Sequence, residues 1–563
     1  MDGFGDLYIQ CYVDYNMPEY NYQLILKNIF PSAMWDHPDQ EIVYRELRRY
    51  RLAQFYDRVS RLASGLSKIG VRMGDRVAVL DWDTDRYMEA YYAIPMMGAV
   101  LHTVNIRYPQ DLIFYTMQHA EDSFVILSEE FLPVIERTSN LFSFVRGWIV
   151  HSDTKKEVKT SLPPNVYQYE DLVSHSEPYE FPDLSENTTA TIFYTSGTTG
   201  LPKGVTFTHR QLVLQAMANS LVGNRNPLHL NEDDVYMSLV PMFHVHSWTM
   251  PYFVVISGNK YVLPGRFDVK RVLDLIKNEG VTYSFMVPSI LYMILTHPEV
   301  DQYRDYLRGG WKVSVGGSAL PKGGLAEMAS KFGITTIGGY GLSETCPVLT
   351  VATYTRSVKA MREEEQIEYR ISTGIPLPLV NLRVVDSNGK DVKRDGKTIG
   401  GEIVVRAPWL TKEYYKDPEK TQALWRDGWL HTGDLATIDT MGYLHIVDRE
   451  KDAIKSGGEF IPSLLLEDII SLAPGGVGEV AVVGGKHDEK WGERPVAFVT
   501  KKGDVTEKSI LEFLEKQASA GRIQKWWIPD SIVFVDSMPR TSTNKIDKKE
   551  LRKVLEAGGV RGG

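Results

Sequence analysis

The stretch that decides the fold reads YTSGTTGLPKG and covers residues 194–204. It lies between two runs rich in β-branched and aromatic residues, TIFYT before it and GVTFT after it, so we expect a loop that joins two strands. Its glycines expose backbone N–H groups, its serine and threonines supply hydroxyls, and Lys203 supplies a positive charge. Such a loop can surround a polyphosphate.

Three other interpretations of this loop fit the sequence less well. A Walker A loop needs a second glycine five positions after Gly197, where Pro202 stands, so that pattern fails. A nucleophile elbow needs glycines on both sides of Ser196, and Tyr194 and Thr198 occupy those positions. A polar surface turn has a similar composition, but the full string is more specific than a turn requires.

The regions around the loop predict an α/β protein. From about residue 75 to 345, apolar strand-like runs alternate with helical patterns, which indicates βαβ units and largely parallel sheets. Residues 268–280 have helical spacing and end in a glycine. We therefore expect a large N-terminal domain that contains two βαβ subdomains.

The later part of the chain has different patterns. From about 371 to 447, β-rich runs meet at Asn388-Gly389 and Met441-Gly442, which predicts antiparallel hairpins and a small β-barrel. From about residue 449 the order hairpin, helix, strand, strand, helix predicts a compact α+β unit. We expect an N-terminal domain over residues 1–448 and a small, mobile C-terminal domain over residues 449–563.

Composition excludes several classes of protein. The 563 residues carry a net charge of −9 without a polybasic run, which argues against nucleic-acid binding. The two cysteines, Cys11 and Cys346, cannot form a disulfide framework, and no Cys/His cluster has zinc spacing. The first residues lack a signal-peptide pattern, and the longest apolar stretch, residues 90–101, is too short to span a bilayer. We expect a cytoplasmic protein without a transmembrane segment.

The 194–204 loop resembles the phosphate-binding loop of the adenylate-forming superfamily, which comprises acyl-CoA synthetases, aryl-CoA ligases, luciferases and peptide-synthetase adenylation domains. Further motifs of that superfamily follow in order over nearly the whole chain: PMFHVHSW at 241–248, GGSALP at 316–321, GGYGLSET at 338–345, HTGDLA at 431–436, VDREKDAIKSGGE at 447–459 and PRTSTNKIDKKEL at 539–551. The resemblance implies ATP, Mg2+ and CoA as the ligands of the chain, together with a carboxylic acid.

The resemblance also implies a nucleotide site. Tyr340 would stack on adenine, Asp434 and Arg449 would contact the ribose, Ser343 would contact phosphate, and Glu344 would hold Mg2+. The superfamily usually has threonine where Ser343 stands. The remaining residues implied to contact ATP are Thr195, Ser196, Gly197, Thr198, Thr199, Lys203, Gly317, Ser318, Ala319 and Gly341.

Catalytic positions follow from the same resemblance. Lys545 would serve adenylation, since a mobile ammonium offsets the repulsion between a carboxylate and the α-phosphate. The superfamily usually has glycine before this lysine, and this chain has Asn544. His244 would stand beside the carboxylate and thiol path, although a lone histidine among apolar residues is usually a core residue.

The hinge and thioester positions lie around residue 450. Lys451 would be the hinge of the C-terminal domain. Lys455, Gly457 and Gly458 would face the thioester-forming step, with the two glycines lining a CoA tunnel.

The acyl pocket is implied to involve His246, Trp248, Gly338, Gly339 and Gly341. Acetate-specific relatives have tryptophan at the position of Gly341, so we expect a deeper pocket here. A polar floor at His246 would admit an ω-hydroxy acid such as 4-hydroxybutyrate. The flanking strings are most similar to those of short- and medium-chain fatty acyl-CoA synthetases.

The sequence therefore predicts an AMP-forming acyl-CoA synthetase for short- to medium-chain acids. An aryl-CoA ligase or luciferase-like enzyme with the same first step, and a non-catalytic nucleotide-binding homologue, remain alternatives. The acyl chain length and the oligomeric state are left open.

Overall fold

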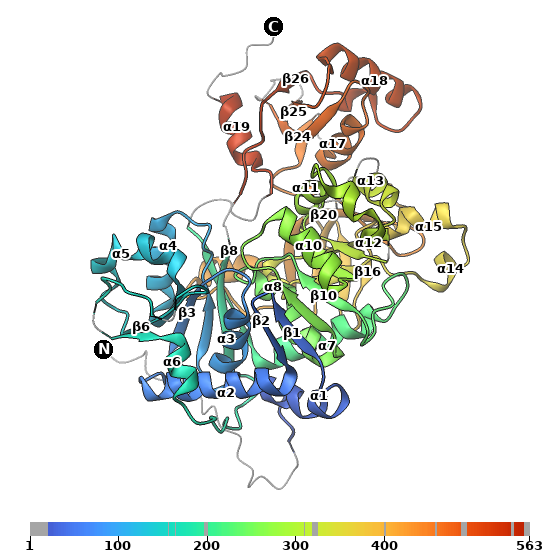
Figure 1. The fold of residues 1–563 in the computed structure, drawn as a ribbon. Coiled ribbons are helices and arrows are strands. Elements are labelled where there is room, and N and C mark those ends of the chain that lie inside the picture. The colour runs from blue at the N-terminus through green and yellow to red at the C-terminus, as the bar shows by residue number, and fades with distance from the viewer. Residues whose placement is uncertain are drawn as a thin grey trace.

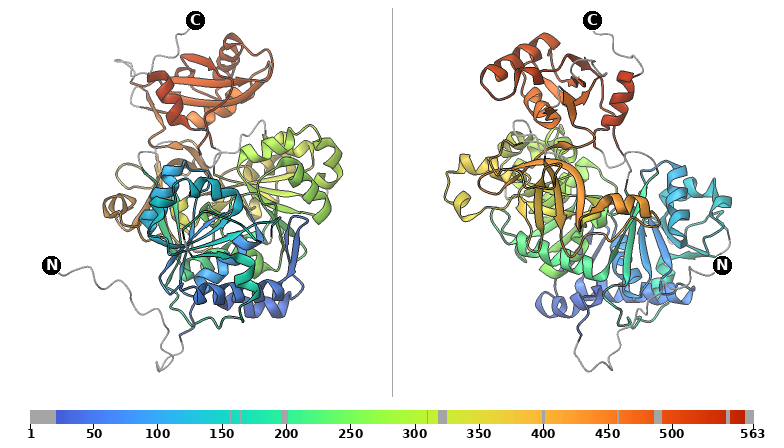
Figure 2. Two further views of the ribbon diagram at one scale, coloured as in Figure 1. Left: turned by 60° about the vertical axis from the view of Figure 1, so that its left-hand side comes forward. Right: turned by 180° about the vertical axis from the view of Figure 1, so that it is seen from behind.

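The computed structural model describes residues 21–155, 157–163, 165–195, 201–308, 310–317, 325–398, 401–456, 459–485, 492–541 and 545–556. Figure 1 shows a large body formed by the first four-fifths of the chain and a smaller C-terminal part on top of it. Figure 2 shows the same division from two further sides.

The first large sheet has seven strands in the order β7-β6-β5-β3-β4-β8-β9. All neighbouring pairs are parallel except β8 with β9, which form an antiparallel hairpin. Its strands are β3 (Arg76–Leu80), β4 (Val100–Thr103), β5 (Asp122–Ser128), β6 (Gly147–His151), β7 (Val166–Gln168), β8 (Thr189–Thr195) and β9 (Lys203–Thr208). The phosphate-loop candidate therefore connects β8 to β9, as predicted.

The second large sheet has nine strands in the order β16-β15-β14-β13-β12-β10-β11-β1-β2. Its central pairs are parallel, and antiparallel strands close both edges. Its strands are β1 (Glu41–Tyr44), β2 (Arg48–Arg51), β10 (Val235–Ser238), β11 (Lys260–Leu263), β12 (Tyr283–Met286), β13 (Lys312–Val315), β14 (Thr335–Gly341), β15 (Val348–Val351) and β16 (Ile375–Pro376). The two predicted βαβ subdomains are thus present.

The β-rich region is an antiparallel sheet in the order β17-β18-β20-β19, with β21 paired to β20. Its strands are β17 (Asn381–Val385), β18 (Gly401–Arg406), β19 (Trp425–Arg426), β20 (Trp429–Ile438) and β21 (Leu444–Arg449). The described strands do not close into a ring, so the expected small barrel is an open sheet. Its pairing places Asp434 opposite Arg449.

The C-terminal part contains the predicted hairpin, β22 (Ile454–Ser456) with β23 (Glu459–Ile461), and a sheet in the order β24-β25-β26. The sheet strands are β24 (Val477–Gly484), β25 (Pro495–Lys501) and β26 (Ser531–Phe534). The helices here are α17 (Ser463–Ser471), α18 (Glu507–Ser519) and α19 (Lys548–Glu556).

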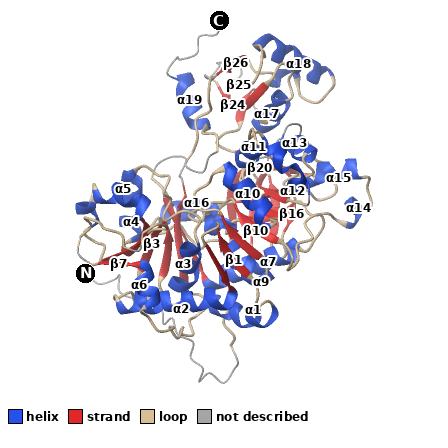
Figure 3. Ribbon diagram, in the orientation of Figure 1, coloured by secondary structure: helices blue, strands red, loops and turns tan. Residues whose placement is uncertain are grey.

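The helices of the large body pack on the two large sheets (Figure 3). They are α1 (Phe30–Asp36), α2 (Leu52–Lys68), α3 (Asp85–Met96), α4 (Gln110–Ala120), α5 (Leu132–Glu136), α6 (Tyr169–Ser174), α7 (His209–Gly223), α8 (Val245–Trp248), α9 (Met250–Ser257), α10 (Val269–Glu279), α11 (Pro288–Leu295), α12 (Arg304–Arg308), α13 (Leu325–Lys331), α14 (Arg356–Lys359) and α15 (Glu363–Arg370). Helix α16 (Pro418–Leu424) packs instead against β19 and β20 of the β-rich region. Helix α10 begins after Asp268, whose side chain accepts a hydrogen bond from the Arg271 N–H, and ends at Gly280 in a left-handed conformation, as its sequence predicts.

Successive side chains of a strand point to opposite faces of its sheet and therefore belong to different hydrophobic clusters. In β3, Val77 and Val79 join a cluster that includes residues of α2, α3, α7 and α9, whereas Ala78 and Leu80 face α4 and α5. The clusters of the large body end at Leu444, and separate clusters hold residues 454–551 together. These separate cores support the predicted boundary near residue 448, which remains a prediction.

The C-terminal part and the large body are also in contact. The Lys502 ammonium lies 4.3 Å from the ring centre of Tyr292 in α11. Within the described ranges, no helix is long and apolar enough to cross a membrane.

Candidate active site

A cleft of about 2070 Å³ runs between the large body and the C-terminal part. It opens at the carboxyl ends of β10, β12, β13 and β14, whose following residues line it: Leu239, Val287, Gly316, Gly317 and Leu342. Ligands of open α/β sheets bind at this edge, because parallel strands direct the loops that follow them to one side.

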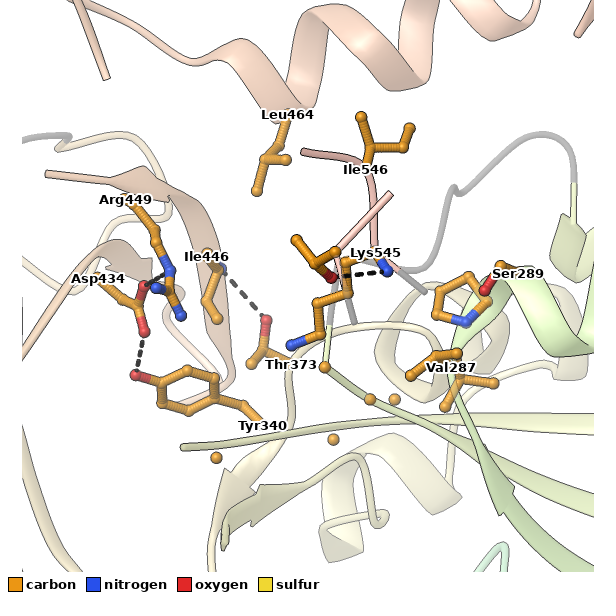
Figure 4. Close-up of a pocket in the computed structure, with 18 of the residues that line it drawn as sticks. Val287, Ser289, Tyr340, Thr373, Asp434, Ile446, Arg449, Leu464, Lys545 and Ile546 are labelled. Carbon is orange, nitrogen blue, oxygen red and sulfur yellow. Dashed lines mark hydrogen bonds and ion pairs between the residues drawn. The ribbon is translucent and has the colours of Figure 1, made fainter. Parts of the chain in front are cut away.

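One end of the cleft holds a connected polar group on three strands (Figure 4). The Tyr340 hydroxyl donates to Asp434 Oδ2 at 2.7 Å, and Arg449 Nε lies 3.2 Å from Asp434 Oδ1. Asp434 is 3% exposed, and burial raises the pKa of its carboxyl, while Arg449 and Tyr340 offset part of that rise. An aspartate held in this way can accept hydrogen bonds from a ribose. This is the arrangement expected for the nucleoside end.

Lys545 reaches into the same cleft from the C-terminal part. A Cβ built on Gly317 would lie 3.2 Å from Lys545 Cε and 3.4 Å from its Nζ, so the ammonium lies close to the glycine after β13. The Lys545 N–H donates to Thr541 Oγ1 at 3.2 Å, which holds the base of the side chain. Burial, with the Arg449 charge, lowers the pKa of Lys545 to about 8. Asn544 lies outside the described residues.

His244 lines the cleft from the loop that joins β10 to α8. Desolvation, together with the charges of Lys545 and Arg107, lowers the pKa of His244 to about 3, so the imidazole is neutral at physiological pH. The structure thus brings His244 and Lys545 to one cleft, from segments about 300 residues apart in the sequence.

Thr195, Lys203, Ser343 and Glu344 also line the cleft, and the Glu344 carboxylate lies near enough to Asp434 and Arg449 to interact with their charges. The Lys203 ammonium lies 4.4 Å from the ring centre of Tyr414, whose hydroxyl donates to Glu344 Oε1 at 2.6 Å. Ser196, Gly197, Thr198, Thr199, Ser318 and Ala319 lie outside the described residues, so their predicted contacts are not seen.

Glu344 fits the predicted magnesium site. A carboxylate oxygen is the ligand type that Mg2+ prefers, and Tyr414 occupies only one of the two oxygens. Among the described residues, no group of three or more His, Cys, Asp and Glu side chains gathers to hold a metal. Glu344 would therefore share the ion with substrate phosphates and water.

Trp248 contributes to the apolar lining of the cleft, together with Phe243 and Phe285. The Trp248 ring lies 5.3 Å from that of Phe285, and a Cβ on Gly316 would lie 2.9 Å from Trp248 Cη2. The glycine at 316 therefore makes room for the indole.

Trp248 is placed by an unusual backbone. Residues 245–249 all have positive φ angles, from 47° to 63°, so α8 is a left-handed turn. Such a turn costs about 1–2 kcal/mol per residue for L-amino acids. Buried hydrogen bonds hold it, among them Thr191 Oγ1 with His246 Nε2 at 2.7 Å and Ser238 Oγ with Ser247 Oγ at 2.9 Å.

The structure changes the expectations for His246. It is fully buried and does not line the cleft, because the left-handed turn directs its ring away from it, against Phe193 and Phe207. Thr191 already occupies Nε2. The proposed polar floor for a hydroxy acid is therefore wrong.

Gly341 also differs from its expected role. A Cβ there would lie 1.8 Å from the carbonyl oxygen of Pro347, and a Cβ on Gly338 would lie 1.9 Å from that of Ser372. Both glycines line the cleft, but each permits a close approach of neighbouring backbone. At Gly339 the nearest backbone atom would be 3.3 Å away.

The family model described as AMP-binding enzyme matches residues 31–415. The family model described as AMP-binding enzyme C-terminal domain matches residues 465–545. The chain belongs to the AMP-binding enzyme family. It is an AMP-forming acyl-CoA ligase, and enzymes of this class use a carboxylate, ATP, Mg2+ and CoA.

Individual AMP-binding enzymes resemble the chain over nearly its full length. A long-chain-fatty-acid–CoA ligase of Thermus thermophilus is 39% identical, over 93% of this chain and 97% of the relative. A medium-chain-fatty-acid–CoA ligase of Ectopseudomonas oleovorans is 34% identical, over 94% and 96%. The crystal structure of ATP-bound MatB from Rhodopseudomonas palustris has a TM-score of 0.78 at 26% identity, over 94% of this chain and 98% of MatB.

The hinge and thioester candidates of this AMP-binding enzyme lie around the start of the C-terminal part. Lys451 is exposed within a tight turn, in which the Asp452 and Ala453 N–H groups donate to the Arg449 carbonyl. Lys455 is exposed in β22 and does not line the cleft that holds Lys545. Gly457 and Gly458 lie outside the described residues.

Tyr414 and Gly316 are two of the cleft residues to which the sequence analysis assigned no role. Tyr414 lies in the segment TKEYYKD, which shows only a pair of tyrosines without a recognisable pattern. Gly316 was seen only as the first residue of GGSALP. Nothing in the local sequence indicates that one tyrosine lies between Lys203 and Glu344, or that one glycine accommodates Trp248.

Proposed function

We propose that this AMP-forming ligase activates straight-chain fatty acids of short to medium length. The observation that carries the proposal is the position of Lys545 beside Gly317 in the cleft. The Tyr340–Asp434–Arg449 group lies at one end of this cleft, and Trp248 lines its other, apolar end. A carboxylate whose tail lies against the indole would have its head group near Lys545 and His244.

In the first half-reaction, a carboxylate oxygen attacks the α-phosphorus of ATP and pyrophosphate leaves. The Lys545 ammonium spans the two anions and offsets the charge that develops between them. Asp434 and Arg449 hold the ribose. Lys203 contacts the outgoing phosphates. Glu344 would hold Mg2+, which would screen the phosphate charge.

His244 stays neutral in this step. Because its pKa is lowered to about 3, it can donate a hydrogen bond to the carboxylate without forming an ion pair. A neutral donor orients the carboxylate but leaves it nucleophilic.

In the second half-reaction, the thiol of CoA attacks the acyl carbonyl of the adenylate and AMP leaves. We propose that the C-terminal part rotates about Lys451 and presents Lys455, Gly457 and Gly458 in place of Lys545. The exposed position of Lys455, outside the Lys545 cleft, supports a second face with a separate role.

The hinge can be tested with Lys451→Pro. The Lys451 N–H is not a donor in the hydrogen bonds of the described residues, so proline removes no bond but fixes φ. We expect pyrophosphate release with little thioester formation. Unchanged overall turnover would place the hinge elsewhere.

The acyl range is tested by a carboxylate panel from acetate to hexadecanoate, with benzoate and 4-hydroxybutyrate included, scored by AMP formation with CoA. The proposal expects the highest kcat/KM between butyrate and decanoate. A maximum at benzoate would favour an aryl-CoA ligase, and absence of pyrophosphate release with every acid would indicate a nucleotide-binding homologue without catalysis. A cytoplasmic location is part of the proposal, and cell fractionation tests it.

A further inference from the structure

Three elements meet around Tyr414. The Tyr415 N–H donates to the Gly204 carbonyl at 2.8 Å, next to Lys203. The Thr411 N–H donates to the Glu344 carbonyl at 2.9 Å. The segment 410–415 therefore binds both the strand that begins at Lys203 and the short helix η5 (Ser343–Thr345), which carries Glu344.

The Tyr414 side chain makes two different contacts, one through its hydroxyl and one through its ring. Its hydroxyl donates to Glu344 Oε1 at 2.6 Å, and its ring contacts the Lys203 ammonium at 4.4 Å from the ring centre. Tyr414 itself is only 6% exposed, and its N–H donates to Thr421 Oγ1 at 2.9 Å, so the residue is held from several sides.

Lys203 and Glu344 carry opposite charges, and both line the cleft. Among the described residues no ion pair joins these two side chains, and each contacts Tyr414 instead. Their fields still interact, since the Glu344 charge raises the pKa of Lys203 against the effect of burial. A direct ion pair would neutralise both groups and cover the carboxylate oxygens. Tyr414 satisfies each group separately, by a hydrogen bond and by a cation–π contact.

We propose that Tyr414 is a positioning residue that keeps Lys203 and Glu344 apart and oriented, so that the phosphates of ATP and Mg2+ can enter between them. This proposal rests on the function proposed above. The hydroxyl orients the Glu344 carboxylate with its second oxygen available for the ion, and the aromatic face holds the ammonium at a fixed distance.

Three variants separate these two contributions. Tyr414→Phe removes the hydroxyl and keeps the ring. Tyr414→Leu removes both and allows Lys203 and Glu344 to pair. Tyr415→Phe is the matched control, because it deletes a hydroxyl one residue away, where the ring packs on His119.

The measurement is calorimetric binding of a non-hydrolysable ATP analogue, over a series of Mg2+ concentrations, without acid or CoA. Loss of a partner of a metal-binding carboxylate typically weakens metal affinity by about 10- to 100-fold. We expect the Mg2+ concentration for half-maximal nucleotide binding to rise about tenfold in Tyr414→Phe. Tyr414→Leu should also weaken nucleotide binding without Mg2+, and Tyr415→Phe should match the wild type.

The outcomes separate the two proposals. If wild-type protein binds no nucleotide at any Mg2+ concentration, the proposed function fails. If wild-type protein binds and Tyr414→Phe has the same Mg2+ dependence as Tyr415→Phe, the positioning role of Tyr414 is overturned. Circular dichroism and thermal melting verify folding, and the Phe variant alone decides if the Leu variant does not fold.

Discussion

The two ends of the cleft are built in different ways. At the proposed nucleoside end, polar side chains contact one another directly, as Tyr340 and Arg449 do with Asp434. At the proposed acyl end, the backbone determines the shape of the cleft: a left-handed turn presents Trp248, and Gly316 accommodates its ring. The first end depends on residue types that chemistry requires, and the second on how segments from different sheets pack together.

The largest loss of activity should come from removing the Lys545 ammonium, which lies between the two ends of the cleft. We expect Lys545→Ala to lower acyl-adenylate formation by about a hundredfold or more, because a preorganised charge stabilises the transition state. Thioester formation from supplied acyl-adenylate should be largely spared. Lys553→Ala, an exposed lysine in α19, is the control. Pyrophosphate release and thioester formation are measured separately, and equal loss in both would contradict the separate roles proposed for Lys545 and for the face of the C-terminal part that carries Lys455.

A glycine variant tests whether backbone approach shapes the cleft. Gly341→Ala places a Cβ 1.8 Å from the Pro347 carbonyl oxygen, so backbone must move, and we expect destabilisation on the order of 3 kcal/mol. Gly339→Ala, with its nearest contact at 3.3 Å, should be milder. The melting temperatures of the two variants, compared with that of the wild type, test this prediction. A stable Gly341→Ala protein that shifts its preference toward acetate would restore the role as pocket floor.

The acyl wall is tested by Trp248→Ala. If the indole ends the pocket, its loss admits longer acids, and two further buried methylenes are worth about 1.6 kcal/mol, or about a tenfold change in preference. The kcat/KM ratio of dodecanoate to octanoate should rise accordingly. Trp35→Ala, at a tryptophan that is 90% exposed, should leave the ratio unchanged. An unchanged ratio in Trp248→Ala would place the end of the pocket elsewhere.

The smallest predicted effect is a pH dependence. The pKa of Lys545 is lowered to about 8, and the protonated form is the active one, so adenylation is sustained below this pKa and lost as pH rises through it. Between pH 7.5 and 8.5, kcat/KM for ATP should fall about threefold. Lys545→Arg keeps its charge and should flatten this limb of the profile. A wild-type profile that is flat up to pH 9.5 would contradict the assignment.

The features that could be predicted from the sequence are those that depend on local patterns and on residue type. The strands around β3, β8 and β9, and the hairpins of the β-rich region, appear where alternating apolar residues and turn residues predict them. Tyr340, Asp434 and Lys545 reach one cleft as the ordered motifs imply. The roles of these residues in catalysis remain predictions until the variants are measured.

His246 and Gly341 show where sequence reasoning was wrong. Both lie in motifs that line the cleft, but one ring points into the core, and one glycine faces backbone rather than substrate. Side-chain direction within a motif depends on φ and ψ, and five consecutive positive φ angles at non-glycine residues have no local sequence pattern.

The sequence by itself determined the family, the alternation of strands and helices, and the residue types that nucleotide chemistry needs, because these depend on local patterns and on chemically constrained side chains. The motifs implied Trp248 in the acyl pocket, but only the tertiary structure decided the direction of its ring against Gly316 and the place of Tyr414 between Lys203 and Glu344. These features arise where segments up to about 200 residues apart pack together, and their energies depend on contacts that no single segment contains.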